Sequence, residues 1–253
     1  MRLPDVVGRT ARSWGAPPAP QPCTRRAKLP GVRIAVVIPA LHEADRIRAC
    51  VASARAPGVE VVVVDGGSRD ATARRAREAG ARVLRSAPGR ARQLASGVAA
   101  TRAETILFLH ADTTLPPGWE GAVRAALADP GVVGGAFRLR FDERGPAMRV
   151  VEWGARLRVA LTGLAYGDQA LFARRAALEA IGGVPQVPLM EDVELVRSLA
   201  GKGRLVWLPL AVTSSARRYR RGGVLRTWLG HAGALVAFRA GVDRARIARW
   251  LGR

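Results

Sequence analysis

The chain has 253 residues, of which 49% are hydrophobic and 24% charged, which is enough for one domain with a sizeable core but too short for two full domains. Its formal net charge of +21 favours anionic partners such as phosphate-bearing substrates or acidic membranes, unless the Arg excess merely reflects a GC-rich genome. Nucleic acid is excluded as the main partner, because the 5% of aromatic residues are not interleaved with basic residues in a stacking pattern.

The first 32 residues are predicted to be a disordered tail or a stretch upstream of the true translation start. Their closely spaced prolines deny both helix and strand hydrogen bonds. The N-terminus lacks the apolar segment of a secretory signal, and the chain lacks an 18-residue apolar run for a membrane-spanning helix. Cys23 and Cys50 form neither a disulfide framework nor a metal-ligand spacing, so a cytoplasmic location is expected.

Short apolar strands alternate with helices from residue 33 to residue 110. The expected elements are strand 34–38, helix 44–54, strand 59–64, helix 71–79 with Asp70 as its N-cap, strand 82–85, helix 91–100 and strand 105–110. The strands are nearly continuous apolar runs, as expected where both faces of a sheet are covered. Helices of about ten residues between such strands are typical of βαβ units and a parallel sheet.

The pattern changes in the second half of the chain. Residues 136–141 alternate, with Phe137, Leu139 and Phe141 on one face, which favours an antiparallel or edge strand with one covered face. Further expected elements are helix 149–161, strand 169–173, helix 191–200 and strand 205–208. Residues 217–253 form a basic extension whose apolar run 228–238 predicts a helix packed on the domain or, alternatively, an amphipathic helix on an anionic membrane.

Acidic residues follow three of the predicted parallel strands. They are Glu43, Asp65 and Asp112, and ligands of parallel α/β sheets lie beyond the carboxyl ends of the strands. A buried carboxylate is costly unless it is paired or bound to something, so this convergence predicts a binding site. Asp65 can accept a hydrogen bond from a base or a ribose, and Gly66 and Gly67 allow close approach of the backbone. The alternative at this point is a plain turn closed by Asp-Gly.

His110 and Asp112 point the same way if the segment between them is extended, so both can address one ion. Asp112 offers the hard oxygen that suits Mg²⁺ or Mn²⁺, and such ions usually complete their shell with substrate phosphates. His110 is a candidate ligand, a supporting group or a donor to phosphate. The alternative is a structural histidine at the end of a strand.

Taken in order, six segments resemble family 2 glycosyltransferases with the GT-A fold: IAVVIPALHE, VVVVDGGSRDAT, PGRARQ, FLHADT, YGDQALFARR and MEDVEL. The chain looks closest to the bacterial subgroup of arsenosugar-biosynthesis-type glycosyltransferases, over residues 33–241. The resemblance implies an α/β fold, with a mixed, mostly parallel sheet flanked by helices, in a catalytic domain of residues 33–216.

The resemblance also implies a set of residues around a nucleotide-sugar donor. They are Pro39, Ala40, Glu43, Asp65, Gly67, Ser68, Asp70, Arg90, Gln93 and His110. Among them, Asp65 would bind the base, commonly uracil. Asp112 matches the last acidic residue of the family's metal-binding D-x-D motif, which implies Mg²⁺ or Mn²⁺ as cofactor. His110 replaces the first Asp of that motif and so departs from the family-wide pattern.

The segment at Glu191 and Asp192 resembles the family's E-D pair at the start of a helix, where the dipole stabilises a carboxylate. An inverting transfer needs a base to take a proton from the acceptor hydroxyl, and we assign that role to Asp192 with Glu191 as support. Gly167, Asp168 and Gln169 match the acceptor-side segment of the family. The acceptor itself, a small molecule or a lipid, is not specified by the sequence.

Four arginines of the basic extension are candidates to fold over the donor diphosphate, namely Arg217, Arg218, Arg220 and Arg221. The main alternative to an enzyme is a non-catalytic nucleotide-sugar-binding module, which predicts donor binding without turnover. A nucleotidyltransferase would carry a Gly-rich A-G-G-x-G-x-R loop after the first strand, where this chain has IPALHEADR. A protein that mainly binds membranes or nucleic acid would do so without metal. Peripheral contact with the inner face of the membrane is compatible with the enzyme.

Overall fold

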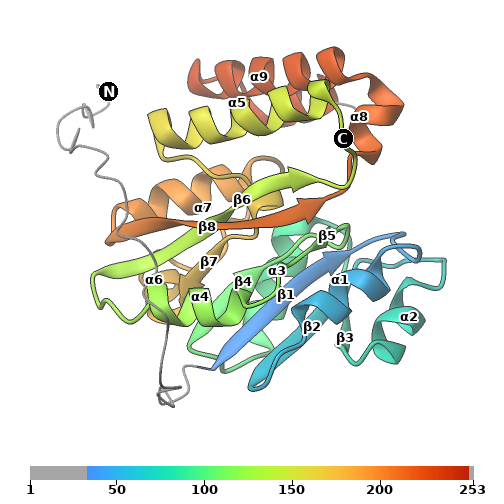
Figure 1. Ribbon diagram of the computed structural model, residues 1–253, viewed down its shortest axis with the longest axis vertical. Coiled ribbons are helices and arrows are strands. Elements are labelled where there is room, and N and C mark those ends of the chain that lie inside the picture. The colour runs from blue at the N-terminus through green and yellow to red at the C-terminus, as the bar shows by residue number, and fades with distance from the viewer. Residues whose placement is uncertain (1–32, 251–253) are drawn as a thin grey trace. The chain divides into compact units, whose positions relative to one another are not determined.

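The computed structural model describes residues 33–250, which form an eight-stranded mixed sheet with helices on both faces (Figure 1). The predicted tail at 1–32 lies outside the described residues. The strands are β1 (Ile34–Ala40), β2 (Val59–Asp65), β3 (Arg82–Arg85), β4 (Thr105–Phe108), β5 (Thr113–Thr114), β6 (Val132–Phe141), β7 (Phe172–Arg174) and β8 (Arg204–Ser214).

Helices connect most of these strands. They are α1 (Ile47–Ala54), α2 (Thr72–Glu78), α3 (Arg90–Ala99), α4 (Trp119–Ala126), α5 (Pro146–Thr162), α6 (Arg175–Ala180), α7 (Glu191–Ala200), α8 (Arg217–Gly222), α9 (Val224–Arg239) and α10 (Arg244–Trp250), with a 3-10 turn at Gly167–Gln169. The C-terminal helices belong to the same compact unit as the sheet. Within the described part of the chain, no helix combines the length and the apolar character needed to cross a bilayer.

The strand order is β3-β2-β1-β4-β7-β6-β8-β5. β1 pairs in parallel with β2 and β4, and β2 with β3, so the predicted parallel half is confirmed. β7 is antiparallel to both β4 and β6, while β6 and β8 run parallel. This arrangement brings the carboxyl ends of β1, β2 and β4 to one edge of the sheet, where the acidic residues follow.

Alternate residues of the parallel strands face two separate cores. In β1, Val36 and Ile38 pack towards α1 and α4, in a cluster that includes Trp119. Val37 lies on the opposite face, where the cluster includes Leu94 of α3 and residues of α7. Because both faces are covered, the strands are apolar at nearly every position, as their sequences indicate.

Two local predictions in the site region are wrong. The helix predicted at 71–79 with Asp70 as its N-cap begins at Thr72 and has Ala71 as its N-cap, one residue later than predicted. The Asp70 carboxylate still accepts from the backbone N–H of Thr72, the first residue of the helix. The strand predicted at 169–173 is β7 at Phe172–Arg174, preceded by the 3-10 turn. The Gln169 side chain accepts from the backbone N–H of Tyr166 within the turn, which holds the segment in a compact conformation.

The second half of the sheet also differs in extent from its prediction. β6 is an interior strand between β7 and β8, although Phe137 and Leu139 face the core and Arg138 is exposed, as the alternation indicates. β8 continues to Ser214, well beyond the predicted end at residue 208. The strand β5 and the short helices α4 and α6 were not predicted.

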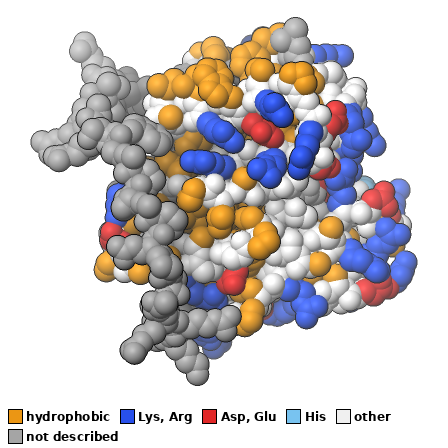
Figure 2. All heavy atoms as spheres, viewed as in Figure 1, with side chains coloured by type: hydrophobic (Ala, Val, Ile, Leu, Met, Phe, Trp, Pro, Cys, Tyr) orange, Lys and Arg blue, Asp and Glu red, His pale blue; other side chains and the backbone are white. Residues whose placement is uncertain are grey.

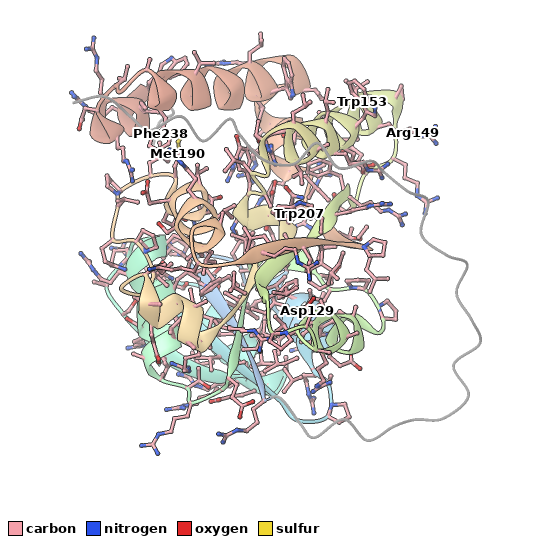
Figure 3. All side chains as sticks on the ribbon, turned by 90° about the vertical axis from the view of Figure 1, so that its left-hand side faces the viewer. Asp129, Arg149, Trp153, Met190, Trp207 and Phe238 are labelled. Atoms are coloured by element: carbon pink, nitrogen blue, oxygen red, sulfur yellow. The ribbon has the colours of Figure 1, made fainter. Side chains whose placement is uncertain are left out.

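The C-terminal helices pack beside the site-bearing half of the domain. Ala234 of α9 and Ile247 of α10 are buried against Leu189, and Met190 and Phe238 adjoin this cluster (Figure 3). α9 contacts α5 as well. The apolar run 228–238 is therefore a helix that packs on the domain along one side.

Gly97 makes the closest approach of α3 to the sheet. A β-carbon at this position would overlap Val37 Cγ1 and lie 3.1 Å from Val64 Cγ2. Gly121 of α4 is also helical, but an added β-carbon there would meet no other described atom within 4 Å.

We therefore expect opposite effects from the same substitution at these two glycines. Gly97→Ala should lower the free energy of unfolding by about 1–3 kcal/mol through overpacking. Gly121→Ala should raise it by about 0.5–1 kcal/mol, because alanine loses less backbone entropy in a helix. Urea denaturation measures the free energy of unfolding of both variants. Equal changes in the two would contradict the close packing of α3 on β1 and β2 at Gly97.

Candidate functional site

A cleft of about 1260 Å³ lies where the segments after β1, β4 and β8 meet the first turn of α7 and the helices α8 and α9. Both carboxylates and arginines line it. The predicted site residues among its lining are Glu43, Arg90, His110, Asp112, Asp168 and Asp192.

Asp192 is held in the cleft by two backbone donors. Its Oδ2 accepts from the N–H of Gly167 at 2.7 Å, and its Oδ1 accepts from the N–H of Val193 at 2.8 Å. A β-carbon at Gly167 would lie 2.7 Å from His110 Nε2 and 3.3 Å from Asp192 Oδ2, so glycine is what allows this approach. The carboxylate is thus oriented by the backbone and still faces the cleft.

Arg90 lies at the centre of the charged groups. It pairs with the buried Glu191, and its Nη1 lies 3.3 Å from His110 Nε2. Burial alone would lower the pKa of Arg90, but the carboxylates of Glu191 and Asp192 outweigh it and raise the pKa. Arg90 is therefore a fixed cation in the cleft, and the pair with Glu191 compensates the burial of that carboxylate.

Arg217 of α8 reaches across to the residues that follow β1 and β4. Its Nη2 donates to Glu43 Oε1 at 2.6 Å and lies 3.9 Å from Asp112 Oδ2. The hydrogen bond to Glu43 raises the pKa of Arg217 further above its ordinary value. The C-terminal helices and the parallel sheet therefore meet through charges at this point.

The donor atoms in the cleft fit a divalent ion that is held partly by a substrate. Among the described residues, no three His, Cys, Asp or Glu side chains gather closely enough to ligate a metal by themselves. Asp112 presents a carboxylate that is 26% exposed in the cleft, and Glu43 Oε2 is buried without a hydrogen-bond partner in the described structure. A shell of one or two carboxylates completed by phosphate oxygens is typical of Mg²⁺.

Cys50 supports the segment that carries this carboxylate. Its thiol donates to the backbone oxygen of His110 at 3.3 Å from beneath the cleft. Burial, with the nearby charge of Asp112, raises the pKa of Cys50, so the thiol stays neutral. Cys50 is therefore a packing residue rather than a thiolate ligand.

Asp168 also lines the cleft, and it directly follows Gly167, whose N–H holds Asp192. Its Oδ1 is inaccessible to solvent and has no hydrogen-bond partner among the described residues. Burial raises the pKa of Asp168 above its ordinary value of 3.8; the cation of Arg158 opposes the rise, and the carboxylate of Asp192 adds to it. Arg158 also stacks on the ring of Tyr166, 3.4 Å from its centroid, so this wall is densely packed.

Several residues predicted around the donor lie behind the cleft. Asp65 is buried and accepts from the backbone N–H of Ser68, and the Ser68 hydroxyl accepts from the N–H of His42, which lines the cleft. Asp70 accepts from the N–H of Ala44, and the hydrogen bond from Thr72 lowers the pKa of Asp70. These groups connect the loop after β2 to the loop after β1.

Gln93 and Gln169 are occupied by backbone groups. Gln93 Nε2 donates to the carbonyl oxygens of Ala40 and Val64, which ties the ends of β1 and β2 together. Gln169 Nε2 donates to the carbonyl of Phe137. Both side chains are buried and stabilise the backbone around the site rather than lining the cleft. Pro39, Ala40 and Gly67 are also not among the residues that line the cleft in the described structure.

The four arginines proposed to cover a diphosphate do not all face the cleft. Arg217, Arg218 and Arg221 line it, whereas Arg220 points towards Glu143, with its Nε 3.5 Å from Oε2. The inclusion of Arg220 in that group is therefore wrong. The ion pair with Glu143 draws the Arg220 guanidinium away from the cleft, although Arg220 follows Arg217 by three residues on the same helix.

Other lining residues were not singled out from the sequence. They include Leu41, His42, Phe141, Tyr166, Ser214, Ser215, Tyr219, Arg226, Thr227, Leu229 and Trp250. His42 and Leu41 had a usable signal, since they directly follow β1. Ser214 is the last residue of β8 and Ser215 follows it, and the predicted end of this strand at residue 208 was too early to draw attention to them.

Comparison with known proteins gives one family and one fold. The model of the family described as "Glycosyl transferase family 2" matches residues 35–179, which is more than half of the chain. No curated protein matches the chain. The matched segment covers Asp65, Arg90, Asp112 and Asp168, while Asp192 lies beyond it.

Solved structures share the fold. Glucosyl-3-phosphoglycerate synthase from Mycobacterium tuberculosis, in complex with Mg²⁺ and uridine diphosphate, is 23% identical, with a TM-score of 0.61 over 84% of this chain and 81% of the other. The same enzyme with Mn²⁺, UDP-glucose and phosphoglyceric acid is 24% identical, with a TM-score of 0.60 and the same coverage. A mannosyltransferase from Pyrobaculum calidifontis, with GDP-mannose and Mn²⁺, is 24% identical, with a TM-score of 0.60 over 76% of this chain and 61% of the other. The predicted GT-A architecture is confirmed.

The raised pKa of Asp168 predicts how stability depends on pH. Its contribution favours folding below pH 3.8 and is lost as the pH rises through the higher folded value, because the folded state disfavours the ionised carboxyl. Asp168→Asn removes this pH-dependent loss of stability, because the amide of asparagine does not ionise. The variant should match the natural chain near pH 3.5 and exceed it in free energy of unfolding at pH 7.5, as measured by urea denaturation.

Asp45→Asn provides the control for this measurement. The Asp45 side chain is 98% exposed, so its replacement should leave the pH dependence of stability nearly unchanged. If Asp168→Asn were less stable than the natural chain at pH 7.5, the attraction of nearby arginines such as Arg158 would outweigh the partial burial of this carboxyl, contrary to the raised pKa.

Proposed function

The chain belongs to glycosyl transferase family 2, and on that basis we propose that it transfers a sugar, with inversion, from a nucleoside diphosphate sugar to a hydroxyl acceptor. The observation that carries the proposal is the position of Asp192. Its carboxylate is fixed by two backbone N–H groups and faces the same cleft as Asp112 and the arginines. One cleft thus combines a base with groups suited to a diphosphate.

The proposed donor is a UDP-linked sugar held with Mg²⁺ or Mn²⁺. Two structures with the same fold contain Mn²⁺ together with UDP-glucose or GDP-mannose, which supports this class of donor. Asp112 is the residue that would hold the ion, jointly with the diphosphate. When bound, such an ion neutralises the diphosphate and stabilises it as a leaving group.

Arginines of the cleft would share the charge of the leaving group. Arg90 is already fixed by Glu191, so its guanidinium is oriented before a ligand arrives. Arg217 is paired with Glu43, and both side chains of this pair are more exposed than Glu191 is. A phosphate oxygen that enters the cleft can take the place of the Glu43 carboxylate as the partner of Arg217. Arg217 can therefore exchange Glu43 for the donor diphosphate.

Asp192 would act as the general base. Its carboxylate takes the proton of the acceptor hydroxyl as that oxygen attacks the anomeric carbon from the face opposite the diphosphate. The bond between the anomeric carbon and the phosphate oxygen breaks in the same step, and the electron pair leaves with the diphosphate. The N–H groups of Gly167 and Val193 keep the carboxylate oriented.

Asp168 is proposed to contact the acceptor. It lines the cleft on the Asp192 side and carries an oxygen without a hydrogen-bond partner in the described chain. An acceptor hydroxyl would donate to the side of this carboxylate that lines the cleft, because Oδ1 itself is closed to solvent. Glu191 acts on the reaction only through Arg90.

The activity is tested by release of nucleoside diphosphate from UDP- and GDP-sugars, with Mn²⁺, with Mg²⁺ and with chelator. Turnover should require the metal. Asp192→Asn should lower kcat about 10²–10⁴-fold with little change in donor KM, because it removes the base and leaves the diphosphate site intact. A product of inverted anomeric configuration, identified by NMR, confirms the stereochemistry.

Asp129→Asn is the control for this assay, because Asp129 pairs with Arg204 at the opposite end of β6 from the cleft (Figure 3). It should retain full activity. A natural chain that binds the donor but never turns it over, with or without acceptor candidates, would favour the non-catalytic binding module instead.

The arginines of α8 allow a second, matched comparison. Arg217→Met should raise the donor KM about 10- to 100-fold, the loss expected for one charge-assisted hydrogen bond to phosphate. Arg220→Met removes the same charge from the next turn, but Arg220 faces Glu143 rather than the cleft, so its KM should stay near that of the natural chain. Equal effects of the two substitutions would exclude a specific role for Arg217.

A further inference from the structure

Helix α5 carries two apolar stripes on opposite faces. At about 100° per residue, Met148, Val151, Ala155 and Val159 form one stripe, and all four are buried against the end of β6 or the sheet core. The second stripe consists of Val150, Trp153, Leu157 and Leu161 and lies roughly opposite. A helix that packs only on its own domain needs the first stripe and not the second.

The second stripe is open to solvent. Val150 is 67% exposed, Trp153 62% and Leu161 75%. Figure 3 shows Trp153 together with Arg149 on α5, away from the sheet. Single exposed apolar residues are ordinary, but a stripe of four with helical spacing is not explained by the fold.

Helix α9 extends this apolar surface. It contacts α5, and a β-carbon at Gly154 would lie 3.7 Å from the indole nitrogen of Trp228. Trp228, Leu229 and Val236 of α9 are exposed. Figure 2 shows hydrophobic side chains gathered over the helices drawn uppermost in Figure 1. We call the exposed apolar residues of α5 and α9 the apolar surface: Val150, Trp153, Leu157, Leu161, Trp228, Leu229 and Val236.

The charges around the apolar surface are almost all positive. The acidic residues of the segments 146–162 and 217–250 are Glu152 and Asp243. Glu152 accepts from the backbone N–H of Phe141, and Asp243 accepts from that of Arg246. Arg149 and Arg156 are exposed on α5, and Arg226 is exposed on α9. A partner that complements this surface has an apolar interior for the exposed hydrophobic side chains and negative charges at its surface for the cationic rim of surrounding arginines.

We propose that the apolar surface docks the protein on an anionic lipid bilayer. Trp residues favour the boundary between headgroups and acyl chains, while Arg side chains pair with lipid phosphates. An interfacial helix of this kind lies in the plane of the membrane with its apolar side chains just below the headgroups. A second copy of this chain is disfavoured as the occupant, because two cationic rims would then face each other.

The apolar surface continues into the cleft. Leu229 and the exposed Trp250 both line the cleft, and Arg226 lines it as well. Docking through α5 and α9 therefore places the cleft entrance next to the headgroups. A lipid-borne hydroxyl would then be within reach as acceptor, a consequence that rests on the proposed transferase function, whereas docking itself does not.

The test is co-sedimentation with phosphatidylglycerol vesicles and with phosphatidylcholine vesicles, without donor or metal. The natural chain should bind phosphatidylglycerol more tightly, and high salt should weaken that binding. The variant Val150→Ser/Trp153→Ser/Leu161→Ser should bind at least about tenfold more weakly. Its hydrolysis of donor should be unchanged, because none of the three residues lines the cleft. Substitutions on α5 are preferable to removal of residues 217–253, which line the cleft in part.

Two further variants make the result specific. Trp207→Ser removes a partly exposed tryptophan of β8, outside the apolar surface, and should bind vesicles like the natural chain. Arg149→Gln/Arg156→Gln should lose much of the preference for phosphatidylglycerol and leave the apolar stripe intact. Equal vesicle binding by the natural chain and the triple variant, or no binding by the natural chain, overturns the proposal. A natural chain that instead self-associates, with dissociation in the triple variant, overturns it in favour of a contact between copies.

Discussion

The parallel register of β1, β2 and β4 is the constraint on which the site depends. Strands paired in parallel end at the same edge, so whatever follows them must share the space beyond it. In this chain the residues that follow include acidic ones, and Arg217 lies close to the carboxylates of both Glu43 and Asp112. Arg90 supplies a partner for Glu191 and Arg217 one for Glu43, and the cleft lies between these pairs.

The two pairs differ in a way that matters for binding. Glu191 is nearly fully buried, so its pair with Arg90 is a permanent part of the structure. Arg217 is partly exposed and comes from a short helix near the C-terminus, and beside it lie Asp112 and a Glu43 oxygen without a partner in the described residues. The pair of Arg90 and Glu191 orients the site. Around the pair of Arg217 and Glu43, carboxylate and guanidinium groups remain that a metal ion and a diphosphate can bind. Family 2 membership and the shared GT-A fold agree with that division.

The parallel half of the fold was predictable because local signals and tertiary structure agree there. Buried strands such as β2 are apolar at almost every position, and Gly or Asp residues mark their ends. The second half was less predictable. β6 reads as a half-covered strand, yet β7 and β8 pair with it on both edges, a long-range arrangement that alternation does not encode. The β7 boundary was missed because side-chain bonds from Gln169 hold a 3-10 turn there.

The site was predictable where a carboxylate follows a strand or begins a helix, as at Asp112 and Asp192. It was not predictable where a polar side chain is buried and donates to backbone carbonyl groups, as Gln93 does.

The proposed function depends most on Asp112, which we propose joins a divalent cation to a diphosphate in this cleft. Calorimetric titration of uridine diphosphate, with Mn²⁺ and with chelator, tests it most directly. We expect metal-dependent binding that Asp112→Asn abolishes and Asp192→Asn preserves, whereas binding of equal strength with and without Mn²⁺ would rule out this role of Asp112.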